Sequence, residues 1–226
     1  MKNMTTAFRF SPSTLNLFLD CPRCFWLQFN KGVQRPRGIF PSLPGGMDRI
    51  LKDYYNSYRK MKKLPPELEG KVEGLLFEDG ALLEEWRNWR KGLVYEDKTL
   101  GVTLTGALDE CLVKGEFYIP LDYKTKGSAP NQEDSEAYYQ NQLDCYCLLL
   151  ESNKRPTCSL AYLVYYYPGN VQKNGLVQFN VEPIKMETDP LRAKETIESA
   201  AALLRGPTPE DDSECEYCRY TGNFEK

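Results

Sequence analysis

The sequence predicts an α/β fold in which helices flank a central mixed β-sheet. Segments with the apolar spacing of helices come first, and strands, a helix, further strands and a final helix follow them in order. This order is typical of a layered α/β arrangement. The 226 residues, of which 41% are hydrophobic, are enough to bury a substantial core. We expect one domain over residues 1–226, with a helical lobe at 11–93, a sheet core at 94–188, and a C-terminal helix with a cysteine tail at 189–226.

The helical lobe is expected to open with a helix that begins at Ser11-Pro12-Ser13. A serine hydroxyl can cap that helix, and proline fits its first turn because the missing N–H has no partner there. Leu15 and Phe18 follow at helical spacing, and the helix runs into Cys21-Pro22-Arg23-Cys24. Residues 35–46 are rich in proline and glycine, which predicts a loop.

The remaining elements follow from apolar periodicity and from the residues that interrupt it. They are expected as a helix from about Asp48 to Leu64-Pro65-Pro66, a helix at 81–91, a strand region at 102–112 that continues or doubles back, a strand at 117–124, a helix at 134–151, strands at 160–167 and 175–181, and a helix at 190–204. The turn Lys114-Gly115-Glu116 leads from the first of these strands into the second, which suggests a hairpin.

Two residue counts limit the chemistry that the chain can perform. The sequence contains eight cysteines and no histidine. A Ser-His-Asp or Cys-His mechanism is therefore excluded, and so is a zinc site that uses imidazole. Acid–base work must depend on Asp, Glu, Lys, Tyr or Cys side chains, or on a metal ion.

The charge balance argues against a uniformly basic nucleic-acid-binding surface, since the formal net charge is -3. Local basic stretches still occur at Arg35 and Arg37, and over residues 59–63. These stretches fit either a solvated helix face or a track for phosphates. No apolar run approaches the ~20 residues that cross a bilayer, and Met1 to Phe10 lacks the apolar core of a secretory signal. We expect a cytoplasmic protein with no membrane partner.

A carboxylate and a lysine are placed for metal-assisted chemistry near the end of the strand at 117–124. Asp122 and Lys124 stand two positions apart and project from one face of the strand, while Tyr123 turns away. The carboxylate can bind Mg²⁺ or Mn²⁺, and the ammonium can orient a nucleophilic water or offset charge on a phosphate. Asp109 lies thirteen positions earlier, within reach across a hairpin, and Gly106 permits close backbone approach. The alternative is a surface salt bridge between Asp122 and Lys124.

Two C-x-x-C pairs, Cys21 with Cys24 and Cys215 with Cys218, predict a shared four-sulfur metal site. Such a site would join the N-terminal helix to the C-terminal tail. Two C-x-x-C pairs suit tetrahedral zinc. The other four cysteines are expected to pack in the core as reduced thiols: Cys111, Cys145, Cys147 and Cys158.

Four segments resemble motifs of the RecB-like PD-(D/E)XK exonucleases. Residues 106–109 (G-A-L-D) and 119–127 (I-P-L-D-Y-K-T-K-G) are similar to motifs II and III of that family, and 142–146 (Q-L-D-C-Y) is similar to its Q-x-x-x-Y element. Residues 13–25 are similar to its N-terminal S-x-L-x-x-F-x-x-C-P-x-x-F segment. The resemblance extends over about 11–220. It points to the iron–sulfur branch, which includes AddAB-type helicase–nuclease subunits and CRISPR-associated exonucleases of spacer acquisition.

The resemblance implies a restriction-endonuclease-like core and a role for each matching residue. Asp109 and Asp122 would ligate Mg²⁺ or Mn²⁺, the carbonyl of Tyr123 would add a ligand, and Lys124 would be the catalytic lysine. The family's cysteine site implies a [4Fe–4S] cluster, usually with one N-terminal and three C-terminal cysteines. This chain divides its four cysteines two and two, so structural zinc stays open as the alternative.

Gln142 and Tyr146 stand one helical turn apart, and the resemblance implies that both support the active-site geometry. The alternative is a plain amphipathic helix. The family usually places a metal-ligating histidine on an early helix within a G-x-x-x-H-like segment. Asp48 occupies that place here, as a further metal ligand or simply as a helix cap.

The resemblance implies a Mg²⁺- or Mn²⁺-dependent deoxyribonuclease that acts as an exonuclease on single strands or free DNA ends. DNA repair, recombination or CRISPR adaptation would be its setting, with a helicase- or integrase-type protein as a partner. The first alternative is a catalytically weak nucleic-acid-binding or assembly module that keeps the nuclease fold. The second is a redox- or metal-sensing protein built on the four cysteines.

Overall fold

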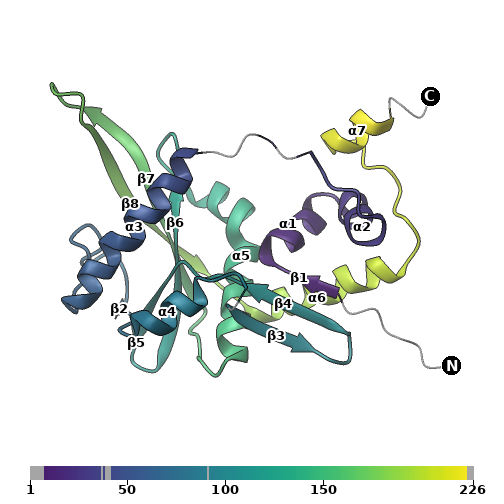
Figure 1. The fold of residues 1–226 in the computed structure, drawn as a ribbon, viewed down its shortest axis with the longest axis horizontal. Coiled ribbons are helices and arrows are strands. Elements are labelled where there is room, and N and C mark those ends of the chain that lie inside the picture. The colour runs from purple at the N-terminus through teal and green to yellow at the C-terminus, as the bar shows by residue number, and fades with distance from the viewer. Residues whose placement is uncertain (1–7, 37, 39–41, 91, 223–226) are drawn as a thin grey trace.

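The computed structural model describes residues 8–36, 38, 42–90 and 92–222 (Figure 1). The strands are β1 (Phe8–Phe10), β2 (Leu75–Leu76), β3 (Leu93–Asp97), β4 (Val102–Gly106), β5 (Glu110–Lys114), β6 (Phe117–Thr125), β7 (Leu160–Val171) and β8 (Val177–Glu187). The helices are α1 (Pro12–Asp20), α2 (Pro22–Lys31), α3 (Ser42–Lys60), α4 (Gly80–Trp86), α5 (Gln132–Ser152), α6 (Pro190–Arg205) and α7 (Glu216–Gly222).

The strands form a five-stranded sheet in the order β2-β5-β6-β7-β8 and a three-stranded sheet in the order β1-β4-β3. In the larger sheet β5 and β6 pair as an antiparallel hairpin, and Gly115 in its turn has the positive φ of 62° that favours glycine. β6 pairs in parallel with β7, and β7 is antiparallel to β8. The predicted mixed sheet and its hairpin are confirmed.

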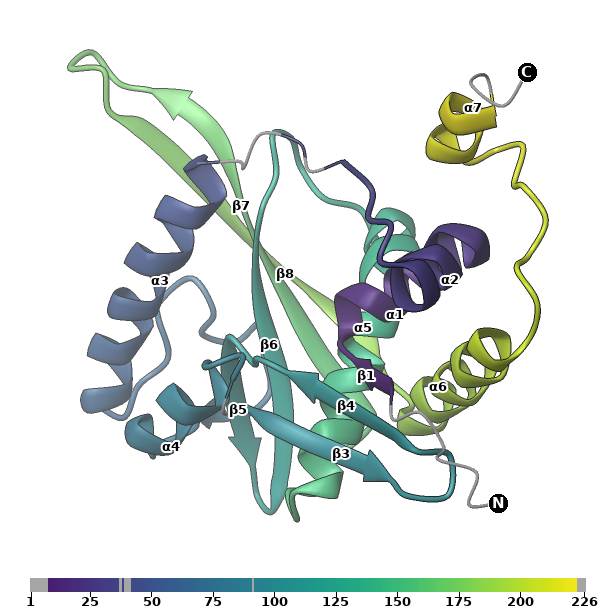
Figure 2. The ribbon, with the colours of Figure 1, turned by 45° about the vertical axis from the view of Figure 1, so that its right-hand side comes forward.

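Helices cover both faces of the larger sheet (Figure 2). On one face, Leu51 and Tyr55 of α3 pack with Leu121 and Tyr123 of β6. On the other face, α5 and α6 pack in a larger cluster that also contains residues of α1, α2 and the smaller sheet. Both faces are therefore buried, as the predicted α/β layering requires.

The first and the central helices follow their sequence signals closely. Ser11 caps α1 by accepting from the Thr14 N–H, while the Thr14 hydroxyl accepts from the Ser11 N–H. Asn131 caps α5 in the same manner through the Asp134 N–H. Within the described ranges, no helix is both long enough and apolar enough to span a bilayer.

Several predicted boundaries are wrong, including those of the last two strands, which end at Val171 and Glu187 instead of 167 and 181. α3 begins at Ser42 instead of near Asp48, because proline in a first turn is compatible with a helix and residues 42–46 continue directly into the apolar stripe. α4 ends at Trp86 instead of about 91, because the Trp86 carbonyl accepts from the Leu108 N–H rather than from the next helical turn. The 102–112 region is divided between β4 and β5, which belong to different sheets.

Candidate active site and four-cysteine site

The β5–β6 hairpin brings the two aspartates together. Glu110 lies opposite Leu121 in the antiparallel register, so Asp109, just before β5, lies opposite Asp122. Asp122 is buried at 1% exposure, whereas the Asp109 side chain keeps 26% of its surface accessible. The predicted meeting of the two carboxylates is therefore present in the structure, and their role as metal ligands stays a prediction.

Lys124 lies beside Asp122, as the two-residue spacing predicts. Its Nζ is 2.5 Å from Asp122 Oδ2 and 3.2 Å from Gln142 Oε1, and it lies 4.4 Å from the centroid of the Tyr139 ring. Burial opposes the ammonium charge, but the neighbouring Asp122 carboxylate outweighs burial and raises the pKa of Lys124. Lys124 therefore stays protonated at neutral pH, where it can donate hydrogen bonds and offset negative charge.

Gln142 connects the other predicted residues from α5. Its side-chain amide donates to Asp122 Oδ1 at 3.1 Å and to the Tyr146 hydroxyl at 2.7 Å. Burial, followed by the charges of Asp122 and Asp109, raises the pKa of Tyr146 well above its ordinary value, so this phenol stays protonated. Gln142 and Tyr146 thus face the aspartates, which a plain amphipathic helix does not require.

Tyr123 points to the opposite face of β6, as strand alternation predicts. Its ring packs 4.7 Å from the Tyr55 ring, and its hydroxyl donates to Glu110 Oε2 at 3.0 Å. A metal could meet only the main chain of Tyr123, so the predicted carbonyl ligand remains a proposal.

Asp48 reaches the site indirectly. Lys52 lies between the two acids, with its Nζ 2.9 Å from Asp48 Oδ2 and 3.3 Å from Asp109 Oδ1. The helix-cap alternative is wrong, because Asp48 lies inside α3. Lys52 was not predicted as part of the site, although its i,i+4 spacing from Asp48 on a helix was a usable signal. The role of Asp48 as a metal ligand stays a prediction. In the structure its carboxylate is paired with the Lys52 ammonium.

The two aspartates make a donor set that fits a hard divalent cation. Burial and the charge of Asp122 raise the pKa of Asp109 to about 6, and Lys52 and Lys124 only partly oppose this. Asp122 Oδ2 is buried without a well-directed hydrogen bond, although it lies in ion-pair contact with Lys124. Crowded carboxylate oxygens of this kind are the ligands that Mg²⁺ and Mn²⁺ prefer.

The crowding predicts that Asp109→Asn stabilises the metal-free protein at pH 8. A folded-state pKa of about 6, against an ordinary 3.8, penalises the ionised carboxylate above pH 6, and the penalty vanishes below 3.8. The variant should gain about 1–3 kcal/mol at pH 8, because one pKa unit corresponds to about 1.4 kcal/mol. Urea unfolding in EDTA at pH 8 and pH 4.5 measures the gain, which should shrink at the lower pH. An equal or lower stability at pH 8 would contradict the prediction.

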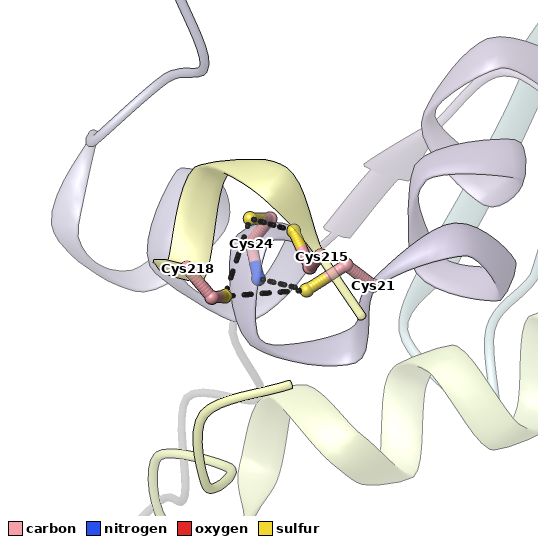
Figure 3. A group of neighbouring side chains, drawn as sticks. All are labelled: Cys21, Cys24, Cys215 and Cys218. Atoms are coloured by element: carbon pink, nitrogen blue, oxygen red, sulfur yellow. Dashed lines mark hydrogen bonds between the residues drawn. The ribbon is translucent and has the colours of Figure 1, made fainter. Parts of the chain in front are cut away.

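The four predicted cysteines form one buried cluster between α2 and α7 (Figure 3). The Sγ atoms of Cys21 and Cys218 are 3.7 Å apart, as are those of Cys24 and Cys215, and those of Cys24 and Cys218 are 3.9 Å apart. No disulfide joins these four described cysteines, and all four ligand atoms lie within 4.8 Å of one another. The predicted link between the N-terminal helices and the C-terminal tail is confirmed.

Arg35 supplies positive charge to this cluster. Its guanidinium donates to Cys215 Sγ at 3.3 Å, forms an ion pair with Asp20 and lies 4.5 Å from the centroid of the Tyr217 ring. Burial opposes ionisation of Cys215, but the N–H groups of Cys218 and Tyr217 and the neighbouring thiols lower its pKa to about 7. One sulfur is thus ready to bind metal as a thiolate near neutral pH.

Arg35 and Arg59 of the predicted basic stretches have partners within the fold, and a phosphate-binding role for the rest stays a prediction. Arg35 donates a hydrogen bond to the cysteine cluster, and Arg37 lies outside the described residues. Arg59 is 6% exposed and its guanidinium lies 2.5 Å from the buried carboxylate of Glu110. The sequence could not reveal this, because the partners of these arginines are distant in the chain.

Glu110 is the centre of a buried polar network that was not predicted from the sequence. Its Oε2 accepts from Arg59, from Arg87 at 3.2 Å and from the Tyr123 hydroxyl, and its Oε1 accepts from the Cys111 N–H. Arg87 also donates to the Asp109 carbonyl at 2.7 Å. The network fixes α3, α4 and β5 around the strand end that carries Asp109.

Comparisons with known proteins identify one family. A sequence model described as the PD-(D/E)XK nuclease superfamily matches residues 9–222. No curated protein matches the chain. Solved structures similar to it include the crystal structure of SSO0001 (13% identity, TM-score 0.42, covering 98% of this chain and 88% of that one). Another is an alkaline exonuclease, LHK-Exo from Laribacter hongkongensis (13% identity, TM-score 0.42, covering 96% of this chain and 95% of that one).

The match spans nearly the whole chain and includes every element that carries a predicted site residue. The mixed sheet between helices, with the four cysteines joining the chain's two ends, is the restriction-endonuclease-like fold that the sequence predicts. The chain belongs to the PD-(D/E)XK nuclease superfamily.

Proposed function

We propose that this nuclease hydrolyses DNA phosphodiester bonds with Mg²⁺ or Mn²⁺, as an exonuclease on single strands or free ends. The observation that carries the proposal is the meeting of Asp109, Asp122 and Lys124 at the β5–β6 hairpin, within a chain of this superfamily. The raised pKa of Asp109 also supports the proposal, because it indicates that the two carboxylates repel each other when no cation lies between them.

Each residue has a distinct task in this proposal. Asp109, Asp122 and the Tyr123 carbonyl would hold the cation, which would supply positive charge at the scissile phosphate. Lys124 remains protonated and stabilises the negative charge that develops on that phosphate. Gln142 positions Asp122 and Lys124 by bonding to both, and Tyr146 accepts from Gln142 to fix its orientation.

Asp48 becomes a further ligand in this proposal if Lys52 swings away from it. The i,i+4 pair is partly exposed, so its separation costs little. The same pair favours a second candidate, a catalytically weak nucleic-acid-binding or assembly module. In that case Lys52 would keep neutralising both Asp48 and Asp109, and metal would not enter.

The RecB-like resemblance supports a role in DNA repair, recombination or CRISPR adaptation, beside a helicase- or integrase-type protein. For the four-cysteine site, three sulfur pairs lie 3.7–3.9 Å apart and all four sulfurs lie within 4.8 Å of one another, which favours a single ion such as zinc over a [4Fe–4S] cluster. Tetrahedral zinc with Zn–S bonds of about 2.3 Å spaces its sulfurs by roughly 3.8 Å. The thiolates of a cluster bind four different irons and must lie farther apart.

The test is cleavage of end-labelled single-stranded and double-stranded DNA by purified protein with Mg²⁺, Mn²⁺ or EDTA. We expect shortening from the ends with either metal and none in EDTA. Lys124→Ala and Asp122→Asn should each lower the rate at least about 100-fold, the usual loss when a group that stabilises a transition state is removed. Lys126→Ala is the matched control, because its side chain is partly exposed and its ammonium pairs with Asp134.

Circular dichroism must show that the variants are folded. Undiminished cleavage by Lys124→Ala and Asp122→Asn would mean that a contaminant cuts the DNA. Metal-dependent DNA binding without cleavage on every substrate would instead favour the weak binding module.

A further inference from the structure

Trp89 is exposed beside the candidate active site. It lies in the segment between α4 and β3, and 70% of its surface is accessible. The other two tryptophans of the chain, Trp26 and Trp86, are 8% and 5% exposed and belong to the core. A large indole left in solvent at this place is not explained by packing.

Three hollows of about 420, 400 and 460 Å³ share Trp89 in their walls. The first also contains Gln142 and Tyr146, both of which face the aspartates. The third contains Lys52, whose ammonium contacts Asp109. Trp89 therefore stands at the rim of the candidate active site, between spaces that are each large enough for a nucleotide-sized ligand.

The second hollow places positively charged side chains beside the Trp89 indole. It is lined by Arg9 and Arg90 with Phe10, Ser11 and Thr105, and it includes no carboxylate. The Arg90 guanidinium lies 4.9 Å from the centroid of the Trp89 ring. An exposed indole with guanidinium groups beside it is the combination that holds unpaired bases and their phosphates in single-strand-binding proteins.

We propose that Trp89 stacks on an unpaired base of a single-stranded nucleic acid, with Arg9 and Arg90 against its phosphates, and so delivers the strand to Asp109 and Asp122. This inference rests on the proposed nuclease function and names its substrate as a strand with unpaired bases. A base inside a duplex has both faces covered by its neighbours and cannot stack on the indole. The platform thereby selects single strands and frayed ends.

Tryptophan fluorescence tests the stacking directly, because Trp89 is the exposed tryptophan of the three. In EDTA, where no strand is cut, adding oligo(dT) of about 20 nucleotides should quench the emission and protect it from acrylamide. Trp89→Ala should weaken oligo(dT) binding roughly 5- to 150-fold, the usual loss for one stacked base. Trp89→Phe should restore most of the affinity, and a blunt hairpin duplex should show little change with either variant.

Tyr138→Ala is the matched control, since Tyr138 is 69% exposed but borders a different hollow on α5. Its affinity for oligo(dT) should equal that of the unmodified protein. In Mn²⁺, Trp89→Ala should raise KM for single strands and leave kcat largely unchanged, because the indole binds the strand away from the scissile phosphate.

The inference is overturned if oligo(dT) leaves the Trp89 emission unprotected, or if Trp89→Ala weakens single-strand and duplex binding equally. Failure of the proposed nuclease function gives a different result: Trp89 would be shielded by oligo(dT), while no metal supported cleavage. The unmodified protein and Asp122→Asn should show the same shielding, which separates strand binding from catalysis.

Discussion

Glu110→Ala is expected to destabilise the fold by about 3–5 kcal/mol, the usual loss when one partner of a buried ion pair is removed. Arg59 and Arg87 both depend on this carboxylate, and the side chain of each is 5% exposed. Without Glu110 the two guanidinium groups would stay buried beside each other, Arg59 would lose its counter-charge, and Arg87 would keep only the exposed Glu84. The Tyr123 hydroxyl would also lose its acceptor.

Urea unfolding of the metal-free protein measures this loss. Glu84→Ala is the matched control, because Glu84 also pairs with Arg87 but its side chain is 61% exposed, so its removal should cost under about 1 kcal/mol. Glu110→Gln should fall between the two, since it keeps an acceptor and loses the charge. If Glu110→Ala lost as little stability as Glu84→Ala, the prediction that the buried network stabilises the fold would be wrong.

The same network shows where sequence reasoning stops. Strand alternation correctly predicts that Tyr123 turns away from Asp122 and Lys124, but it does not say what Tyr123 meets. Its partner Glu110 is bound by Arg59, 51 positions away on α3, and nothing local to either residue indicates the pair. From the sequence alone, Arg59 was therefore interpreted as a solvated or phosphate-binding residue, whereas the packing of α3 buries it in the interior.

Features that depend on local spacing were predictable. The turn at Gly115 fixes the hairpin, and the hairpin places Asp109 opposite Asp122. Most features that depend on pairing between distant segments were not; the four-cysteine site is an exception, because a C-x-x-C pair marks each of its two segments. β1 and β2 have three and two residues and exist because β4 and β5 offer them partners. The split between β4 and β5 was equally hidden, because the same apolar run serves two sheets.

Cys24→Ser is expected to release the C-terminal tail from the rest of the fold. The hydrophobic cluster that holds α7 consists of the four cysteines with Leu17 packed against it, so the described side chains of this helix are buried mainly through Cys218. A structural metal in such a site contributes about 10–16 kcal/mol in small zinc peptides at neutral pH. Removing one thiolate should forfeit much of this contribution, although the sheet and its flanking helices should remain folded because they have separate clusters.

Limited trypsin digestion measures the release, since Arg219 lies on α7 and Arg205 ends α6. Cleavage at these arginines should accelerate at least about 100-fold in Cys24→Ser and in protein treated with a strong chelator. Cys158→Ser is the matched control, because Cys158 is a partly buried thiol outside the cluster. Unchanged digestion of Cys24→Ser would show that α7 is held by contacts other than the four sulfurs.

Metal analysis of anaerobically purified protein decides which species the thiolates hold. A single tetrahedral ion predicts about one zinc per chain, no acid-labile sulfide and a spectrum without visible absorption, and Cys24→Ser should abolish the metal. Four irons with matching sulfide would overturn the single-ion proposal and favour the cluster implied by the resemblance. In both cases the site joins Cys24 to Cys215 across 191 positions, so the metal closes nearly the whole chain into one loop. The nuclease site itself lies on the β5–β6 hairpin within that loop, so losing the cysteine metal should free the tail while leaving the Asp109–Asp122 geometry in place.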